Sequence, residues 1–258
     1  MNIPFYKYQG TGNDFVMIDN RDKIIDKSDL SIAKKLCDRR FGIGADGLIL
    51  IENHPEVDFD MIYFNADGTQ SFCGNGSRCA VAFANFLQII ENKTRFNAID
   101  GIHEATISGE KVELKMGNVK AVEQGSEYFF INTGSPHYIE YRDNLSKIEI
   151  VTEAHKVRYN ERFKTEGTNV NYVQKESDNS LKMRTYERGV EGETLSCGTG
   201  ATAVALSGAI KYKLESPVEI KILGGELSIK FNQISENQFD DIWLIGPAVQ
   251  VFEGIVEV

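Results

Sequence analysis

Two short segments of this chain share one cysteine, two glycines and a run of small residues. The first is FCGNGSRCAVA over residues 72–82, and the second is SCGTGATAVA over residues 196–205. Cys73 and Cys197 each precede a glycine-flanked turn into a helix-like segment, where unpaired N–H groups and the helix dipole favour negative charge. Such a helix start binds a carboxylate and lowers a cysteine pKa from about 8.5 into the range of about 3.5 to 7.5. The two motifs therefore predict two reactive thiols.

A pair of facing thiols suits the inversion of a stereocentre. A thiolate on one face of the carbon removes a proton, and a thiol on the opposite face supplies one. The two groups titrate as a coupled pair because a second thiolate close by is disfavoured. The remaining cysteines, Cys37 and Cys79, lie within helical apolar patterns and are expected to be core residues. Redox use of Cys73 and Cys197, or a reversible disulfide, is the alternative.

The composition is that of an ordinary globular protein and argues against several classes. The chain has 258 residues, of which 41% are hydrophobic and 26% are charged. A net charge of −10 without a basic run argues against a nucleic-acid partner. The sequence has no signal peptide and no apolar run of bilayer length, so a cytoplasmic protein without membrane association is expected. The cysteine spacing does not fit a structural zinc site, and reduced thiols and no metal are expected.

Strand-like patterns outnumber helical ones along the chain. The predicted strands are 61–65, 111–116, 127–133, 169–174, 181–187, 218–231 and 241–254, with a hairpin at Gly224-Gly225. The predicted helices are 30–40, 77–91 and 201–212. The last two are apolar nearly all round, so both should be buried on most sides.

The two cysteine motifs lie 124 positions apart (197 − 73), and each follows a strand-like segment. A weaker echo pairs GTGNDFV (10–16) with GTNVNYV (167–173). We predict an α+β fold of two pseudo-symmetric domains, each a mixed, barrel-like β-sheet rolled around a central helix, with the active site in the cleft between them. The expected domains are 1–117, carrying Cys73, and 118–246, carrying Cys197. The C-terminal strand, about 247–258, is expected to return to the first domain.

One motif is misleading. GIGADG (42–47) matches the letters of a dinucleotide fingerprint, but it follows a helix-like segment and precedes the strand-like LILIE. A dinucleotide loop instead follows a strand and opens a helix. No nicotinamide cofactor is therefore expected.

Over nearly its whole length the sequence resembles the diaminopimelate epimerase family. The resemblance rests on GTGNDF (10–15), RRFGIGADG (39–47), FNADG (64–68), CGNGSRC (73–79), GSPH (134–137), GTNV (167–170), YERG (186–189), GET (192–194), CGTGA (197–201) and GPA…VFEG (246–254). It implies interconversion of LL- and meso-2,6-diaminopimelate, in lysine and peptidoglycan precursor synthesis, without metal or cofactor. The family's proton donor matches Cys73, and its proton acceptor matches Cys197.

The resemblance also implies the other site residues. His137 and Glu187 match positions important for activity. The substrate contacts match Asn13, Asn65, Gly74, Asn75, Asn169, Glu187, Arg188, Gly198 and Thr199. These types suit a ligand with two amino-acid ends, because arginine clamps a carboxylate and asparagine both donates and accepts. The family further implies a homodimer, with Phe252 at a contact position. Arg78 is expected to be a structural ion-pair or helix-surface residue.

The chain departs from the family pattern in three places. Ser135 stands where many members have asparagine, and Gly47 stands where members often have glutamine. The segment ERGVEGET is one residue longer than the usual ERGxGET, so a bulge is expected at Val190-Glu191.

Two other functions are compatible with paired cysteines. A proline racemase or hydroxyproline epimerase also uses two cysteines but lacks the asparagine, glutamate and arginine set for a distal amino-acid end. A thiol-based redox or binding protein would have no turnover of its own, and α-proton exchange in D2O distinguishes it from an epimerase.

Overall fold

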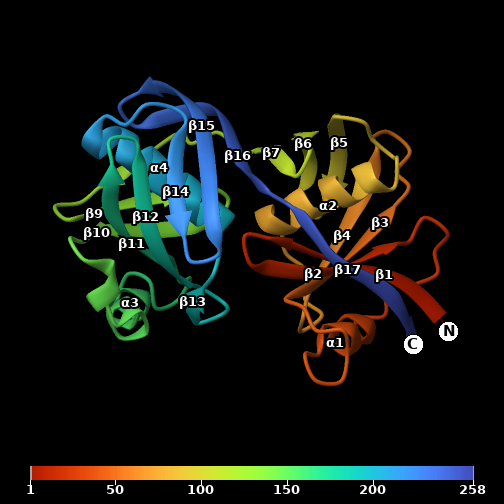
Figure 1. Cartoon of the computed structure of the whole chain (residues 1–258). Coiled ribbons are helices and arrows are strands. Elements are labelled where there is room, and N and C mark those ends of the chain that lie inside the picture. Colours follow the sequence, from red (N-terminus) through yellow and green to blue (C-terminus); the bar gives the residue numbers. More distant parts are fainter. Residues whose placement is uncertain (1, 258) are drawn as a thin grey trace. The chain divides into compact units, whose positions relative to one another are not determined.

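The computed structural model describes residues 2–257. The chain divides into two compact units, Met1–Leu114 with Gly246–Val258 and Lys115–Ile245 (Figure 1). The first unit contains β1 (Asn2–Gly10), β2 (Asn13–Asp19), α1 (Ser31–Cys37), β3 (Gly47–Glu52), β4 (Phe59–Asn65), α2 (Gly74–Phe86), β5 (Lys93–Ala98), β6 (Gly101–Ser108), β7 (Lys111–Lys115) and β17 (Val249–Glu257).

The second unit is likewise rich in strands. It contains β8 (Glu123–Gln124), β9 (Tyr128–Asn132), β10 (Pro136–Tyr141), the 3-10 turn η1 (Leu145–Lys147), α3 (Ile150–Arg158), β11 (Asn169–Ser177), β12 (Ser180–Glu187), β13 (Gly192–Thr194), α4 (Gly198–Tyr212), β14 (Val218–Ile222), β15 (Gly225–Ser235) and β16 (Gln238–Pro247). The predicted α+β class is confirmed.

The two units repeat one pairing scheme. From β1 to β7, successive strands pair antiparallel, parallel, antiparallel, parallel, antiparallel and antiparallel. The same sequence of pairings runs through β9, β10, β11, β12, β14, β15 and β16. In this scheme α1 corresponds to α3, and α2 corresponds to α4. The internal duplication predicted from the cysteine motifs is therefore confirmed.

The strand register shows that the similar segments 10–16 and 167–173 are not at equivalent positions of the two units. The segment 167–173 enters β11, whose counterpart in the first unit is β3, whereas the segment 10–16 enters β2. In the parallel pairs, Phe15 lies opposite Gly47, and His137 lies opposite Asn169. Phe15 is therefore the counterpart of His137. The letters matched because both segments are short turns before a strand, and such turns reuse glycine and threonine.

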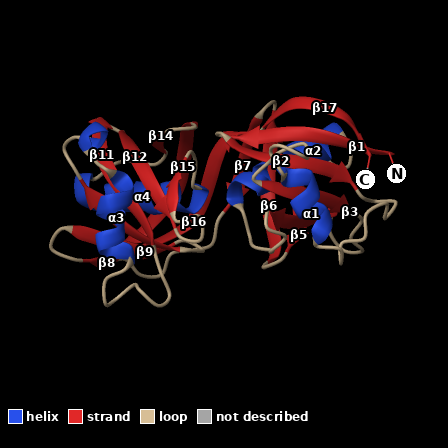
Figure 2. Ribbon diagram, turned by 90° about the horizontal axis from the view of Figure 1, so that it is seen from below, coloured by secondary structure: helices blue, strands red, loops and turns tan. Residues whose placement is uncertain are grey.

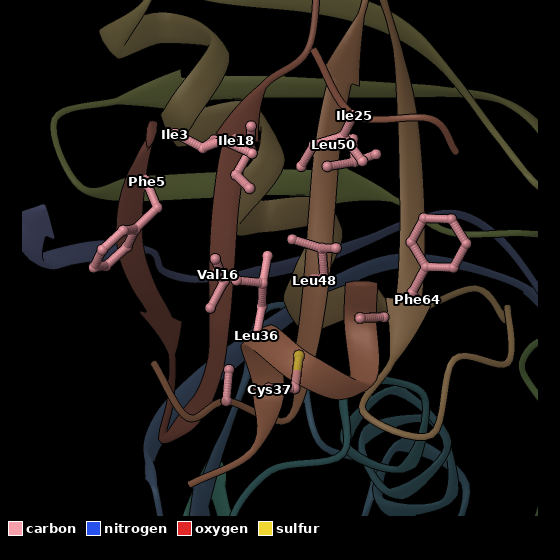
Figure 3. Packing of buried hydrophobic residues seen from close by; sticks show 12 residues of the cluster. Ile3, Phe5, Val16, Ile18, Ile25, Leu36, Cys37, Leu48, Leu50 and Phe64 are labelled. Carbon is pink, nitrogen blue, oxygen red and sulfur yellow. The ribbon is translucent and has the colours of Figure 1, made fainter. Parts of the chain in front are cut away.

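Helices α1 and α2 cover opposite faces of the β1–β4 layer (Figure 1). Side chains along a strand point alternately to the two faces. Leu36 and Cys37 of α1 pack with Val16 and Leu48 on one face, as Figure 3 shows. Strand β3 is buried throughout because both of its faces are covered. Burial of each large apolar side chain contributes about 1.5–3 kcal/mol, which makes this layer a firm support for α2.

Helices α2 and α4 are buried almost along their whole lengths, as their all-round apolar sequences predicted. They begin at Gly74 and Gly198, three residues earlier than expected, because Gly-x-Gly forms the first helical turn itself. Cys73 and Cys197 are consequently the N-cap residues.

Strand β17 pairs antiparallel with β1, from Asn2 opposite Glu257 to Gln9 opposite Val249. Figure 2 shows the two chain ends side by side at this pair. Helix α3 was not predicted, because it buries only Ile150 and Ala154 and so has no continuous apolar stripe.

Candidate active site

Cys73 and Cys197 occupy the same place in the two units. Their backbone angles are nearly identical, with φ −133° and ψ 111° for Cys73 and φ −131° and ψ 105° for Cys197. Cys73 is partly exposed, and Cys197 is buried. Each thiol therefore lies at the positive end of a buried helix, next to the N–H groups of its first turn.

The Cys73 sulfur lies among donors and acceptors of the first unit. The Gly76 N–H donates to Sγ at 3.4 Å, and Sγ lies 3.7 Å from Oδ1 of Asn13. Asn75 donates its amide Nδ2 to the same Asn13 oxygen at 3.2 Å. The structure thus brings the predicted residues Asn13 and Asn75 to Cys73, with Gly74 as the first residue of α2.

An ionic cluster that we did not predict from the sequence orients Asn13. Its Nδ2 donates to Asp46 at 2.7 Å, which turns Oδ1 towards Cys73. Arg39 bridges Asp46 and Asp14 at 2.8 and 2.7 Å, and Lys7 contacts Asp14 at 2.7 Å. Burial raises the pKa of Asp14, but hydrogen bonds from Arg39 and Lys7 outweigh burial and lower it. In the sequence, Asp46 lies in the GIGADG motif, next to Gly47, where family members often have glutamine, and this motif could have pointed to its role.

Asn65 ends β4 and organises the segment that leads to Cys73. Its Oδ1 accepts from the Tyr63 hydroxyl at 2.8 Å, and its Nδ2 donates to Thr69 at 3.0 Å and Ser71 at 3.2 Å. Its counterpart by register is Glu187, which ends β12 ahead of Cys197 and is partly buried. Both predicted contacts therefore end the corresponding strand of their unit, β4 before Cys73 and β12, followed by the short β13, before Cys197.

The Cys197 sulfur lies at the end of a chain of polar side chains. Thr199 Oγ1 is 3.6 Å from Sγ and 2.9 Å from Nε2 of His137. Nδ1 of His137 lies 3.1 Å from the amide nitrogen of Asn171. Burial and the nearby Arg188 charge lower the pKa of His137 to about 3, so this histidine is neutral near pH 7. The predicted residues His137 and Thr199 are thus joined to Cys197, and Asn171 was missed.

Asn169 and Arg188 are joined in the second unit. The backbone N–H of Arg188 donates to Asn169 Oδ1 at 2.9 Å, and the Arg188 guanidinium donates to the backbone carbonyl of Glu166 at 2.8 Å. Asn169 in turn donates to Oγ of Ser135 at 2.9 Å. Ser135, which replaces the family's usual asparagine, therefore orients another predicted contact.

The longer ERGVEGET segment forms a four-residue hairpin loop, 188–191, between β12 and β13, so this loop takes up the extra residue at Val190-Glu191, where a bulge was expected. Glu191 absorbs the extra residue by taking a positive φ of 55°. Its carboxylate accepts from the hydroxyl of Tyr186 at 2.7 Å, from the hydroxyl of Tyr159 at 3.1 Å and from Arg158 at 3.0 Å. The loop that carries Arg188 is thereby anchored at its far end.

Arg78 is neither a surface residue nor part of an ion pair that the structure records, so that prediction is wrong. Its side chain is fully buried, and only Nη2 has a hydrogen-bond partner, the hydroxyl of Thr11 at 3.3 Å. It lies inward because α2 is covered on all sides. Cys37 and Cys79 are core residues as predicted, and burial raises their pKa values to about 12.

Within residues 2–257, no group of three or more histidine, cysteine or acidic side chains is placed to hold a metal ion. In the same range, none of the helices is long and apolar enough to cross a membrane. The GIGADG segment lies between α1 and β3, which is the order that argued against a dinucleotide loop.

Known proteins that are similar to this chain carry the name of the family that these motifs resemble. The sequence profile described as diaminopimelate epimerase matches residues 5–122 and 129–251. A diaminopimelate epimerase from Flavobacterium psychrophilum is 54% identical over 255 residues, which cover 97% of this chain and 99% of the relative.

The chain belongs to the diaminopimelate epimerase family. The predicted family and the predicted class of enzyme, an isomerase of the epimerase type, are confirmed. Solved structures of low identity share the fold. A phenazine biosynthesis protein of the PhzF family from Bacillus anthracis has a TM-score of 0.75 at 16% identity, with full coverage of both chains. A hydroxyproline epimerase from Agrobacterium vitis has a TM-score of 0.68 at 12% identity, covering 99% of this chain and 92% of that one.

Proposed function

We propose that this protein interconverts LL- and meso-2,6-diaminopimelate by proton transfer between the substrate α-carbon and two thiols, Cys73 and Cys197. The observation that carries the proposal is the matching N-cap conformation of the two cysteines, one in each half of a duplicated fold. Membership of the family names the substrate. The reaction belongs to the synthesis of lysine and peptidoglycan precursors.

In the LL-to-meso direction, the Cys197 thiolate takes the α-proton, and its electron pair stays on the carbon. The Cys73 thiol then gives its proton to the opposite face of that carbon. Cys197 ends as a thiol and Cys73 as a thiolate, and the reverse reaction exchanges these roles. The mechanism uses neither metal nor cofactor, because the two thiols supply both the base and the acid.

The N-termini of α2 and α4 stabilise the negative charge that grows on the reacting amino acid. Gly74, Asn75, Gly198 and Thr199 belong to these first helical turns, where backbone N–H groups are available to a carboxylate. For the distal amino-acid end we propose Asn13, Asn65, Asn169, Glu187 and Arg188. Arg188 clamps the distal carboxylate, and Glu187 accepts from the ammonium group.

Deuterium wash-in from D2O at the α-carbon of LL-diaminopimelate, under reducing conditions, tests the reaction. Wild-type protein should incorporate deuterium and form the meso isomer, and Cys73→Ala or Cys197→Ala should abolish epimerisation. Cys79→Ala, which replaces a buried cysteine of the helix that Cys73 caps, is the matched control and should retain activity. Full activity in either N-cap variant would refute the two-thiol mechanism. Absence of exchange in the wild type would favour a thiol-based redox or binding protein, and inversion of proline alone would favour a proline racemase.

We further propose a cytoplasmic homodimer that forms through β17, the strand that pairs with β1. Val251, Phe252 and Ile255 are 57%, 47% and 71% exposed there, a concentration of apolar surface that suits an interface. Phe252 also packs edge-on against Phe5 at 6.0 Å, so its ring is held in place. Sedimentation equilibrium should give a dimer for wild type and a monomer for Phe252→Glu. A monomeric wild type would refute the dimer.

A further inference from the structure

The positions that hold Asn171 and His137 beside Cys197 hold apolar side chains in the first unit, where Asn13 instead is a polar neighbour of Cys73. A Cβ built on Gly200 would lie 2.8 Å from Asn171 Oδ1 and 3.3 Å from both Cys197 Sγ and His137 Cε1. A Cβ built on Gly76, the matching glycine of α2, would meet Ile49, Met61 and Phe15.

By register, Phe15 corresponds to His137, and Ile49 corresponds to Asn171. All four side chains are fully buried. The fold is therefore built with apolar side chains at these positions in the first unit. Burying a histidine and an asparagine in the second unit costs free energy unless their hydrogen bonds are made. Their effect on Cys197 is a reason for a fold to bear this cost.

The orientation of the Asn171 amide follows from its partners. Its nitrogen lies 3.0 Å from the carbonyl oxygen of Tyr138, and a carbonyl can only accept. Its oxygen accepts from the hydroxyl of Thr185 at 3.0 Å. The Asn171 nitrogen therefore faces His137 as well, and it donates to Nδ1 at 3.1 Å.

The tautomer of His137 follows in turn. Because Nδ1 accepts, the single proton of the neutral ring is on Nε2. That N–H donates to Thr199 Oγ1 at 2.9 Å, and the threonine hydroxyl is left to donate its own proton to Cys197 Sγ at 3.6 Å. Every hydrogen bond in the chain then points from Asn171 towards the sulfur, an arrangement that favours the thiolate.

We propose that Asn171 is a positioning residue that locks His137 in the tautomer protonated on Nε2, so that His137 acts on Cys197 as a donor through Thr199 and never as a base. Nδ1 is occupied by the Asn171 donor, and Nε2 already carries a proton, so neither nitrogen is available to take one from the thiol. Among the described residues, the charged or titratable groups that bear on His137 are Arg188, the first residue of the loop after β12, and the Cys197 thiol at the N-cap of α4. The Arg188 charge opposes a second proton on the ring. The proposal rests on the proposed function only in treating Cys197 as a reacting thiol.

Nitrogen-15 NMR of the histidine rings tests the tautomer directly and needs no substrate. The wild-type protein at neutral pH should show His137, assigned with His137→Gln, protonated on Nε2 and unprotonated on Nδ1. Asn171→Asp offers only an acceptor, so it should bring a proton to Nδ1. Thr185→Val, the matched control, removes a neighbouring hydrogen bond while the Tyr138 carbonyl still orients the amide, so it should leave the tautomer unchanged. A wild-type ring protonated on Nδ1, or on both nitrogens, would overturn the proposal.

The pH profile of Cys197 alkylation, read peptide by peptide by mass spectrometry, tests the last step. Thr199→Val removes the donor to sulfur, so half-maximal alkylation should move to higher pH by about one unit, the equivalent of one hydrogen bond. Thr199→Ser keeps the hydroxyl and should restore the wild-type profile. An unchanged profile in Thr199→Val would refute the relay. These measurements are independent of turnover, so a protein that fails to epimerise diaminopimelate still gives a clear result for the tautomer.

Discussion

The second glycine of each cysteine motif faces a different environment, and substituting alanine there should separate the two halves of the fold. At Gly200 the new methyl group would lie 2.8 Å from Asn171 Oδ1, which Thr185 holds by its hydroxyl. Such contacts cost about 1–3 kcal/mol of overpacking, and displacing the amide loses a hydrogen bond worth about 0.5–1.5 kcal/mol. Alanine regains about 1 kcal/mol of helix propensity. The free energy of unfolding should therefore fall by about 1–3 kcal/mol.

At Gly76 the same methyl group meets only the apolar ends of Ile49, Met61 and Phe15, at 3.2 to 3.4 Å. These side chains can shift by a few tenths of an ångström, and the gain in helix propensity of about 1 kcal/mol offsets that cost. Gly76→Ala should therefore be close to neutral in stability.

Urea unfolding followed by circular dichroism measures both variants. The fluorescence of Trp243, the one tryptophan of the chain, reports separately on the second unit, because Trp243 lies in β16. Gly200→Ala should also lower kcat by at least about tenfold, because misplacing a site group by 1 Å costs about a hundredfold. Equal effects of the two alanines, or wild-type kcat in Gly200→Ala, would refute the assignment of the glycine to the polar chain.

Three further predictions concern charged or titrating groups. The unfolded chain binds a proton at His137 below about pH 6.5, whereas the folded protein does so only near pH 3, so this histidine should lower the free energy of unfolding by about 1.4 kcal/mol for each pH unit below 6.5. His137→Gln should flatten the dependence of the unfolding free energy on pH between pH 6.5 and 5, and an unchanged dependence would contradict the buried neutral ring. Glu191→Gln should raise KM for diaminopimelate by about tenfold with kcat nearly unchanged, because it weakens the hydrogen bonds from Arg158 and Tyr186 that hold the loop carrying Arg188. An unaltered KM would show that these contacts of Glu191 are dispensable for substrate binding. Arg78→Met should move half-maximal alkylation of Cys73 to higher pH by about one unit, because the buried guanidinium favours the Cys73 thiolate, and it should leave the alkylation profile of Cys197 in place. A Cys73 profile like that of wild type would count against this electrostatic effect of Arg78.

The sequence by itself determined the chemistry and the elements that present it. Cys-Gly-x-Gly before an all-round apolar segment specifies a cysteine at the start of a buried helix, because glycine permits the close first turn and the lack of a polar face forces burial. These are local properties, so α2, α4 and the duplication could be predicted from residues close together in the chain. The weakly amphipathic α3 could not, because its sequence carries too little of that signal.

Only the tertiary structure decided which residues stand beside each thiol. His137, Asn171 and Thr185 meet because β10, β11 and β12 pair in one register, and a shift of one residue would turn Asn171 to the opposite face of the sheet. The echo between residues 10–16 and 167–173 misled for the same reason, since similar turns enter strands with different neighbours. The inward course of Arg78 and the Asp46 contact to Asn13 likewise depend on contacts between segments far apart in sequence. Sheet register, not local pattern, therefore places Phe15 and Ile49 in the first unit where His137 and Asn171 stand in the second.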